Sequence, residues 1–71
     1  MSDLALTVNG DAMAVPPDTT IAGIVALVLG AEDTKGVAVA VEREVVPRSA
    51  WETTRATAGA RIEIVTAAAG G

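Results

Sequence analysis

The residues with the clearest chemical potential stand at the end of the chain. Ala67-Ala68-Ala69 is followed by Gly70-Gly71, so no side chain in the last five residues is larger than a methyl group. Fully extended, such a segment reaches at most about 17 Å, and its glycines add conformational freedom. We therefore expect a narrow, flexible tail that can enter a cleft in another protein and carry the Gly71 carboxylate with it.

A carboxylate is a poor electrophile, because its negative charge repels nucleophiles. Conversion to an acyl-adenylate with ATP removes that obstacle, and a nucleophile can then take the acyl group. The competing interpretation is a frayed chain end without a function, since termini are often poorly ordered.

The rest of the chain offers little for catalysis or metal binding. Its 71 residues include no His and no Cys, which removes the commonest general base and zinc ligand and excludes disulfides. Ser2 and Ser49 therefore have no histidine to activate them. The acidic residues lack calcium-loop spacing, and no glycine-rich phosphate loop is present. We expect a protein that is not an enzyme and that binds no metal or cofactor of its own.

Charge and hydropathy restrict the partners and the compartment. A net charge of −4 argues against nucleic-acid binding, which requires basic clusters, but it is compatible with partners that have basic docking surfaces. The longest apolar stretch, Ile21 to Leu29, is too short to span a membrane. Met1-Ser2-Asp3 lacks the basic region of a signal peptide. These features predict a soluble cytoplasmic protein.

Residue periodicity predicts strands, one helix and their turns. Asn9-Gly10 is the hairpin signal between the first two strands, Thr20 and its neighbours can cap the helix, and Gly30 is suited to end it. Glu42-Arg43-Glu44 is predicted to form a turn. The segment 48–59 is predicted to be irregular, with Trp51 packed in or beside the core. The predicted strands are 4–8, 11–15, 37–41, 45–46 and 61–65, and the predicted helix covers 21–29.

This order of elements predicts an α+β roll, a mixed sheet of four to five strands with one helix across it. The predicted core consists of Leu4, Leu6, Val8, Ile21, Ile24, Val25, Val28, Val39, Val41, Ile62 and Ile64. Strand alternation then turns a second set outward, and its flat, partly apolar character suits partner docking. This predicted docking face comprises Ala5, Thr7, Ala38, Ala40, Glu63 and Val65.

Several segments resemble the ThiS family, the sulfur carriers of thiamine biosynthesis. The run Val41 to Arg48, followed by Trp51, resembles the family's Val-Pro-Arg segment and its tryptophan. Residues 59–65 resemble its last strand, and Ala69-Gly70-Gly71 matches its terminus. Many relatives carry Asn-Gly where this chain has Glu42-Arg43, and many have a bulky residue before the terminal Ala-Gly-Gly.

The resemblance implies a ubiquitin-like β-grasp domain over residues 1–66 and a flexible tail over 67–71. It also implies that an E1-like adenylyltransferase activates Gly71 with ATP, and that sulfur from a cysteine desulfurase converts the carboxylate to a thiocarboxylate. Thiazole synthase would accept this sulfur. Ala68, Ala69, Gly70 and Gly71 would enter the active sites of these partners.

Three other functions fit parts of the same pattern. The small subunit of molybdopterin synthase shares the fold, the Gly-Gly end and the thiocarboxylate. A ubiquitin-like modifier would join Gly71 to lysines. A plain interaction domain would leave the tail idle.

Overall fold

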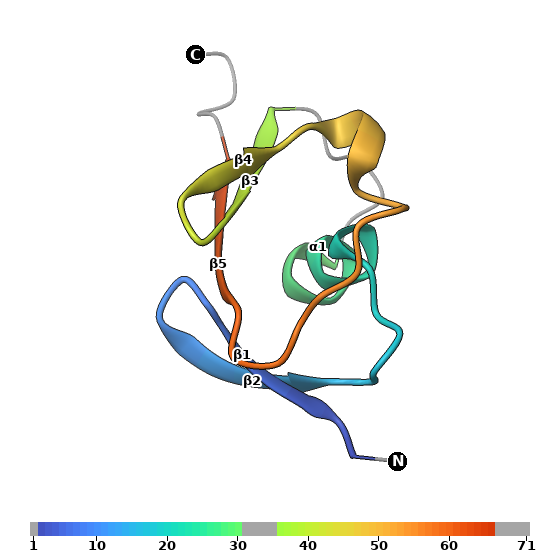
Figure 1. The fold of residues 1–71 in the computed structure, drawn as a ribbon. Helices are drawn as coiled ribbons and strands as arrows, with labels where there is room; N and C mark the ends of the chain where they lie inside the picture. Colours follow the sequence, from blue (N-terminus) through green and yellow to red (C-terminus); the bar gives the residue numbers. More distant parts are fainter. Residues whose placement is uncertain (1, 31–35, 67–71) are drawn as a thin grey trace.

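Strand-forming runs alternate with turn residues along the chain, and one apolar helical segment interrupts them (Figure 1). The computed structural model describes residues 2–30 and 36–66. Within these ranges the elements follow the predicted order, with a 3-10 helix, η1, inside the stretch predicted to be irregular. The elements are β1 (Leu4–Val8), β2 (Asp11–Val15), α1 (Ile21–Leu29), β3 (Val37–Val41), β4 (Glu44–Val46), η1 (Arg48–Ala50) and β5 (Arg61–Thr66).

Two-residue turns close both hairpins of the sheet. Asn9 and Gly10 join β1 to β2 with φ angles of 52° and 86°. Glu42 and Arg43 join β3 to β4 with φ angles of 51° and 70°. Positive φ at both central residues matches the right-handed twist of the strands. The predicted Asn-Gly hairpin is confirmed, and the second hairpin reaches the same sign of φ without glycine.

The last strand occupies the centre of the sheet. The strand order is β2-β1-β5-β3-β4, with β5 parallel to β1 and antiparallel to β3. The predicted mixed sheet is therefore confirmed, with five strands in the described residues. Because β5 pairs on both sides, the segment that leads to the end of the chain is tied to both hairpins.

Both ends of α1 are capped by the residues that the sequence indicated. Thr20 accepts two N–H groups of the first turn, that of Gly23 on its side-chain oxygen at 3.2 Å and that of Ile24 on its carbonyl at 3.0 Å. At the other end, Gly30 adopts the left-handed conformation, with φ of 64°. A Cβ on Gly23 would lie 3.2 Å from the Thr19 methyl carbon, which gives a packing reason for glycine inside the helix.

The loop after η1 satisfies the other two donors of the first helical turn. Ile21 N–H donates to the Thr54 carbonyl at 2.9 Å, and Ala22 N–H donates to the Trp51 carbonyl at 3.1 Å. A helix leaves its first N–H groups without helical partners, and here those of Ile21, Ala22 and Gly23 are all bonded. The loop is therefore held against the helix by main-chain hydrogen bonds as well as by packing.

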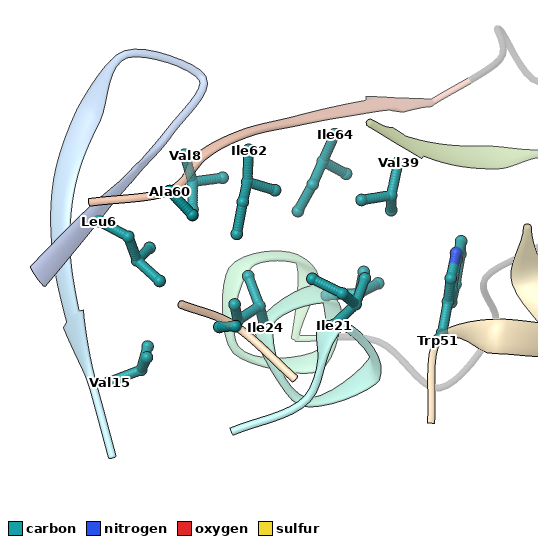
Figure 2. Close-up of a cluster of buried hydrophobic side chains, with 12 residues drawn as sticks. Leu6, Val8, Val15, Ile21, Ile24, Val39, Trp51, Ala60, Ile62 and Ile64 are labelled. Atoms are coloured by element: carbon teal, nitrogen blue, oxygen red, sulfur yellow. The ribbon is translucent and has the colours of Figure 1, made fainter. Parts of the chain in front are cut away.

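The core lies between the inner face of the sheet and α1. Figure 2 shows Val8, Ile62 and Ile64 directed toward the helix, with Trp51 closing one end. Ile24 and Ile62 have no solvent exposure. Most of the predicted core is confirmed, as is the packing role of Trp51. The buried side chains are Leu6, Val8, Val15, Ile21, Ile24, Val25, Val39, Trp51, Ala56, Ala60, Ile62 and Ile64.

The predicted core differs from the observed one at its edges. Val28 is 38% exposed, so its predicted burial is wrong. Its spacing does place it on the apolar stripe of the helix. It lies near the end of α1, however, where it lines an open hollow with Val8 and Met13. Leu4 and Val41 are only half-buried and pack against the core from its rim.

The core predicts a graded response to truncation. Ile24→Ala and Ile62→Ala each remove a fully enclosed side chain, and each should lower the free energy of unfolding by about 2–5 kcal/mol. Val28→Ala, on the same helix but partly in solvent, should cost about 1 kcal/mol or less. Urea titrations followed by Trp51 fluorescence measure all three. An equal loss at Val28 and Ile24 would contradict the assigned burial.

Candidate functional site

The face of the sheet opposite α1 contains every residue of the predicted docking face. Strand alternation turns these side chains away from the core, and none of the six is buried. Thr7 and Ala40 are half-buried, whereas the others are exposed. The strand register places Ala38 beside Val65 and Ala40 beside Glu63. The outward orientation is thus confirmed, and the docking role remains a prediction.

Part of this face forms a shallow hollow of about 200 Å³, here called the apolar hollow. Its floor is flat because Ala38 and Ala40 present only methyl groups. Val45 and Val65 rise beside them and are 74% and 62% exposed. A group of neighbouring apolar side chains that is exposed to solvent is typical of a protein-binding surface. The hollow is lined by Ala38, Val39, Ala40, Val45, Glu63 and Val65.

A second hollow adjoins the first and has a different character. Its lining residues come from both hairpin turns and from β1 and β5. Figure 1 shows the two turns close to each other, on the side of β5 away from α1. The volume of this hollow is about 370 Å³, and Glu63 lines both hollows. Of the predicted docking face, Thr7 belongs to this second hollow, and Ala5 lines neither. This polar hollow is lined by Thr7, Asn9, Gly10, Arg43, Arg61 and Glu63.

The sequence prediction missed several residues that line the two hollows, among them Arg43, Val45 and Arg61. Arg61 precedes Glu63 by two positions on the same strand, so alternation alone could have identified it. Val45 lies opposite Ala40, which only the register of β3 and β4 reveals. Arg43 reaches the face from a turn, where strand alternation gives no guidance.

Side chains from the two turns hold β5 on either side. The Asn9 amide pairs with the backbone of Ile64, accepting its N–H at 2.9 Å and donating to its carbonyl at 3.1 Å. Across the strand, Glu42 Oε1 accepts the Arg61 N–H at 2.8 Å, and the Glu42 N–H donates to the Arg61 carbonyl at 2.9 Å. Each turn therefore continues the ladder one step beyond its strand. Asn9 acts near Thr66, the last described residue before the tail.

Trp51 and the residues before it brace the fold and do not line the outer face. Its indole N–H donates to the Val46 carbonyl at 2.9 Å, and the Arg48 guanidinium lies 5.4 Å from the ring centre. Its own carbonyl accepts the Ala22 N–H. The Val-Pro-Arg and tryptophan pattern thus joins β4 to the start of α1.

The predicted modification site and tail lie outside the described residues. These are Ala68, Ala69, Gly70 and Gly71. Within 2–30 and 36–66, no three His, Cys, Asp or Glu side chains are grouped as a metal site requires. No helix in the same ranges has the length and apolar character needed to cross a membrane.

Comparison with known proteins agrees with this arrangement. The ThiS family model matches residues 6–71, which is nearly the whole chain. The chain belongs to the ThiS family. It is similar to the crystal structure of a thiamine biosynthesis protein (ThiS) from Geobacter metallireducens, with 26% sequence identity and a TM-score of 0.73, over 96% of this chain and 100% of that one. No match to a curated protein was found.

ThiS membership confirms the resemblance that the sequence showed. The five-stranded mixed sheet with its single described helix is the ubiquitin-like β-grasp fold of the ThiS neighbour. The family and the structural match support a sulfur carrier role in thiamine biosynthesis. ThiS proteins work with partner enzymes in that pathway, so the exposed outer face is the surface of interest.

The Asn9 clamp predicts a measurable effect at the base of the tail. Asn9→Ala removes both hydrogen bonds to Ile64 and places alanine at positive φ, so the free energy of unfolding should fall by about 1–3 kcal/mol. Asn9→Gly removes the same bonds but tolerates the turn. Both variants should speed hydrogen exchange of the Ile64 amide. If Asn9→Gly exchanged at the wild-type rate, the clamp would have no energetic role.

Proposed function

We propose that this ThiS protein carries sulfur as a thiocarboxylate at Gly71 and is itself not an enzyme. The E1-like adenylyltransferase binds the outer face and takes the tail into its ATP site. It joins the Gly71 carboxylate to AMP and releases pyrophosphate. The chain holds no cofactor in this scheme, because ATP belongs to the activating enzyme.

Sulfur transfer follows from the chemistry of the adenylate. The outer sulfur of a persulfide, supplied by a cysteine desulfurase, attacks the acyl carbon and expels AMP, which leaves with one of the original carboxylate oxygens. A second thiol on the sulfur-donating side then cleaves the S–S bond of the acyl disulfide. That thiol ends as a disulfide with the former persulfide cysteine, and the thiocarboxylate is released. The product carries sulfur in place of the oxygen that left with AMP. A thiocarboxylate is ionised at neutral pH and is a softer nucleophile than a carboxylate, so it suits donation to thiazole synthase.

The observation that supports this proposal most directly is the position of the apolar hollow. Val65 lines it, and only Thr66 separates Val65 from the tail. A partner seated on the hollow therefore begins its contact within two residues of the segment that it must take up. Ala68, Ala69, Gly70 and Gly71 present no side chain beyond a methyl group to obstruct a narrow channel.

Two alternatives keep the same fold but differ in the acceptor. The small subunit of molybdopterin synthase would deliver sulfur to the large subunit of that enzyme. A ubiquitin-like modifier would transfer the Gly71 acyl group to lysine amines. The match to the ThiS family over residues 6–71 favours the thiamine pathway. Copurification with thiazole synthase, rather than with the large molybdopterin synthase subunit, tests the assignment.

Changes in the tail should abolish the chemistry at Gly71 and leave the stability of the fold unchanged. Deleting Gly71, adding one residue after it, or replacing Gly70 by Val should abolish adenylate and thiocarboxylate formation. The added residue presents the wrong carboxylate, and Val restricts φ and ψ and adds bulk. None of these changes touches the core, so the melting temperature should not move.

Intact-mass analysis after incubation with ATP, the activating enzyme and a sulfur donor measures the product. The wild-type chain should exchange one oxygen for sulfur, and the sulfur should map to the C-terminal fragment. Sulfur on an internal residue, or on the chain that lacks Gly71, would refute the proposal. Isopeptide conjugates to lysines would support the modifier instead.

Arginine substitutions in the apolar hollow should lower the affinity for the activating enzyme and leave the fold intact. Ala38→Arg or Ala40→Arg fills the floor of the apolar hollow and should weaken binding to the activating enzyme by about tenfold, or about 1.4 kcal/mol. Ala26→Arg, on the exposed side of α1, is the matched control and should bind normally. Titration calorimetry gives the affinities, and circular dichroism checks the fold. Equal affinity of all three variants would remove the outer face from the proposal.

A further inference from the structure

The polar hollow concentrates positive charge in an acidic protein. Two guanidinium groups, those of Arg43 and Arg61, line it together with the single carboxylate of Glu63, whereas the whole chain has a net charge of −4. Among the described residues, the one ion pair within 4.0 Å joins Arg55 to Asp18. Neither arginine of the hollow therefore forms an ion pair with a described carboxylate.

One carboxylate that neighbours Arg43 in the sequence forms a hydrogen bond elsewhere. Glu42 precedes Arg43 in the turn, and Glu42 Oε1 accepts the backbone N–H of Arg61 at 2.8 Å. That bond directs the carboxylate to the edge of β5. The residues that line the hollow carry two positive charges and one negative charge, so their sum is opposite in sign to the net charge of the chain. A basic partner surface, which the net charge favours, therefore does not suit this part of the face.

The conformation of Arg43 is a second, independent observation. Its φ is 70°, in the left-handed region that glycine adopts without cost and that other residues adopt at a cost. The second residue of a two-residue turn of this kind is commonly glycine. A strained residue in an ordered turn is reasonable ground for a functional hypothesis. At this position the chain has arginine in place of glycine, and its guanidinium group lines the hollow on the outer face.

The two hollows lie in line along β5. Arg61, Glu63 and Val65 alternate on the outer side of the strand, so Arg61 and Val65 are about 13 Å apart. A docking partner of ordinary size covers both positions at once. Val65 is at the end nearest the tail, and the arginines are at the end farthest from it. The face is thus apolar where the tail leaves and basic at the opposite end.

We propose that Arg43 and Arg61 form a carboxylate-recognition site on the docking face, and that the activating enzyme presents an acidic side chain to it. This inference rests on the proposed function and adds the chemistry of the partner surface. The guanidinium group suits the task because it can hold a carboxylate through two parallel hydrogen bonds. The pair orients the chain on its partner, with the apolar hollow and the tail directed toward the ATP site.

The test compares charge reversals of equal size at different places. Arg43→Glu, Arg61→Glu and the double variant are titrated against the activating enzyme of the same organism at low and at high salt. Arg55→Glu is the matched control, because it makes the same change in net charge and disturbs only an exposed ion pair, which contributes little to stability. Arg43→Gly removes the charge and relieves the turn, so it separates binding from folding.

At low salt the double variant should bind about tenfold more weakly or worse, mainly through slower association, and its affinity should depend less on salt than that of the wild type. Arg55→Glu should bind like the wild type. Arg43→Gly should weaken binding while its melting temperature stays equal or rises.

Two results would overturn the inference while leaving the carrier function in place. One is a double variant that binds the activating enzyme as tightly as the wild type. The other is an Arg55→Glu variant that loses as much affinity as Arg43→Glu or Arg61→Glu, which would indicate a general effect of net charge. If the activating enzyme did not adenylate the wild-type chain at all, the proposed function would fail, and this inference would fail with it.

Discussion

The central position of β5 is the constraint on which the rest of the structure depends. This strand supplies Ile62 and Ile64 to the core on one face and Arg61, Glu63 and Val65 to the outer face. It pairs with a strand of each hairpin, so it cannot move without breaking both ladders. The segment that leads to Gly71 therefore starts from a strand that is held on both sides.

Side chains of the turns complete what the strands begin. Parallel pairing between β1 and β5 is short, covering Thr7 with Arg61 and Val8 with Ile62. The Asn9 amide extends it to Ile64 by imitating a main-chain partner. One residue thus closes a hairpin by its backbone and secures the last strand by its side chain. A turn residue with two such roles is harder to replace than its exposure suggests.

Trp51 and the predicted docking face occupy separate places in the fold. Trp51 and the loop around it satisfy the N-terminal donors of α1 and close one end of the core, so this part of the family pattern serves folding. The outer face is built from small residues and exposed valines on other strands. Arg43, in the turn between β3 and β4, lies beside that face.

The sequence by itself determined the elements, because hydrophobic periodicity, capping residues and Asn9-Gly10 act over short distances. The inner and outer faces of β1, β3 and β5 followed from alternation for the same reason. Tertiary structure decided what depends on distant segments meeting: the burial of Val15, Ala56 and Ala60, the exposure of Val28 near the end of the helix, and the pairing of Val45 with Ala40. It also brought Arg43 to Arg61 in one hollow, since a turn residue has no period from which its direction can be inferred.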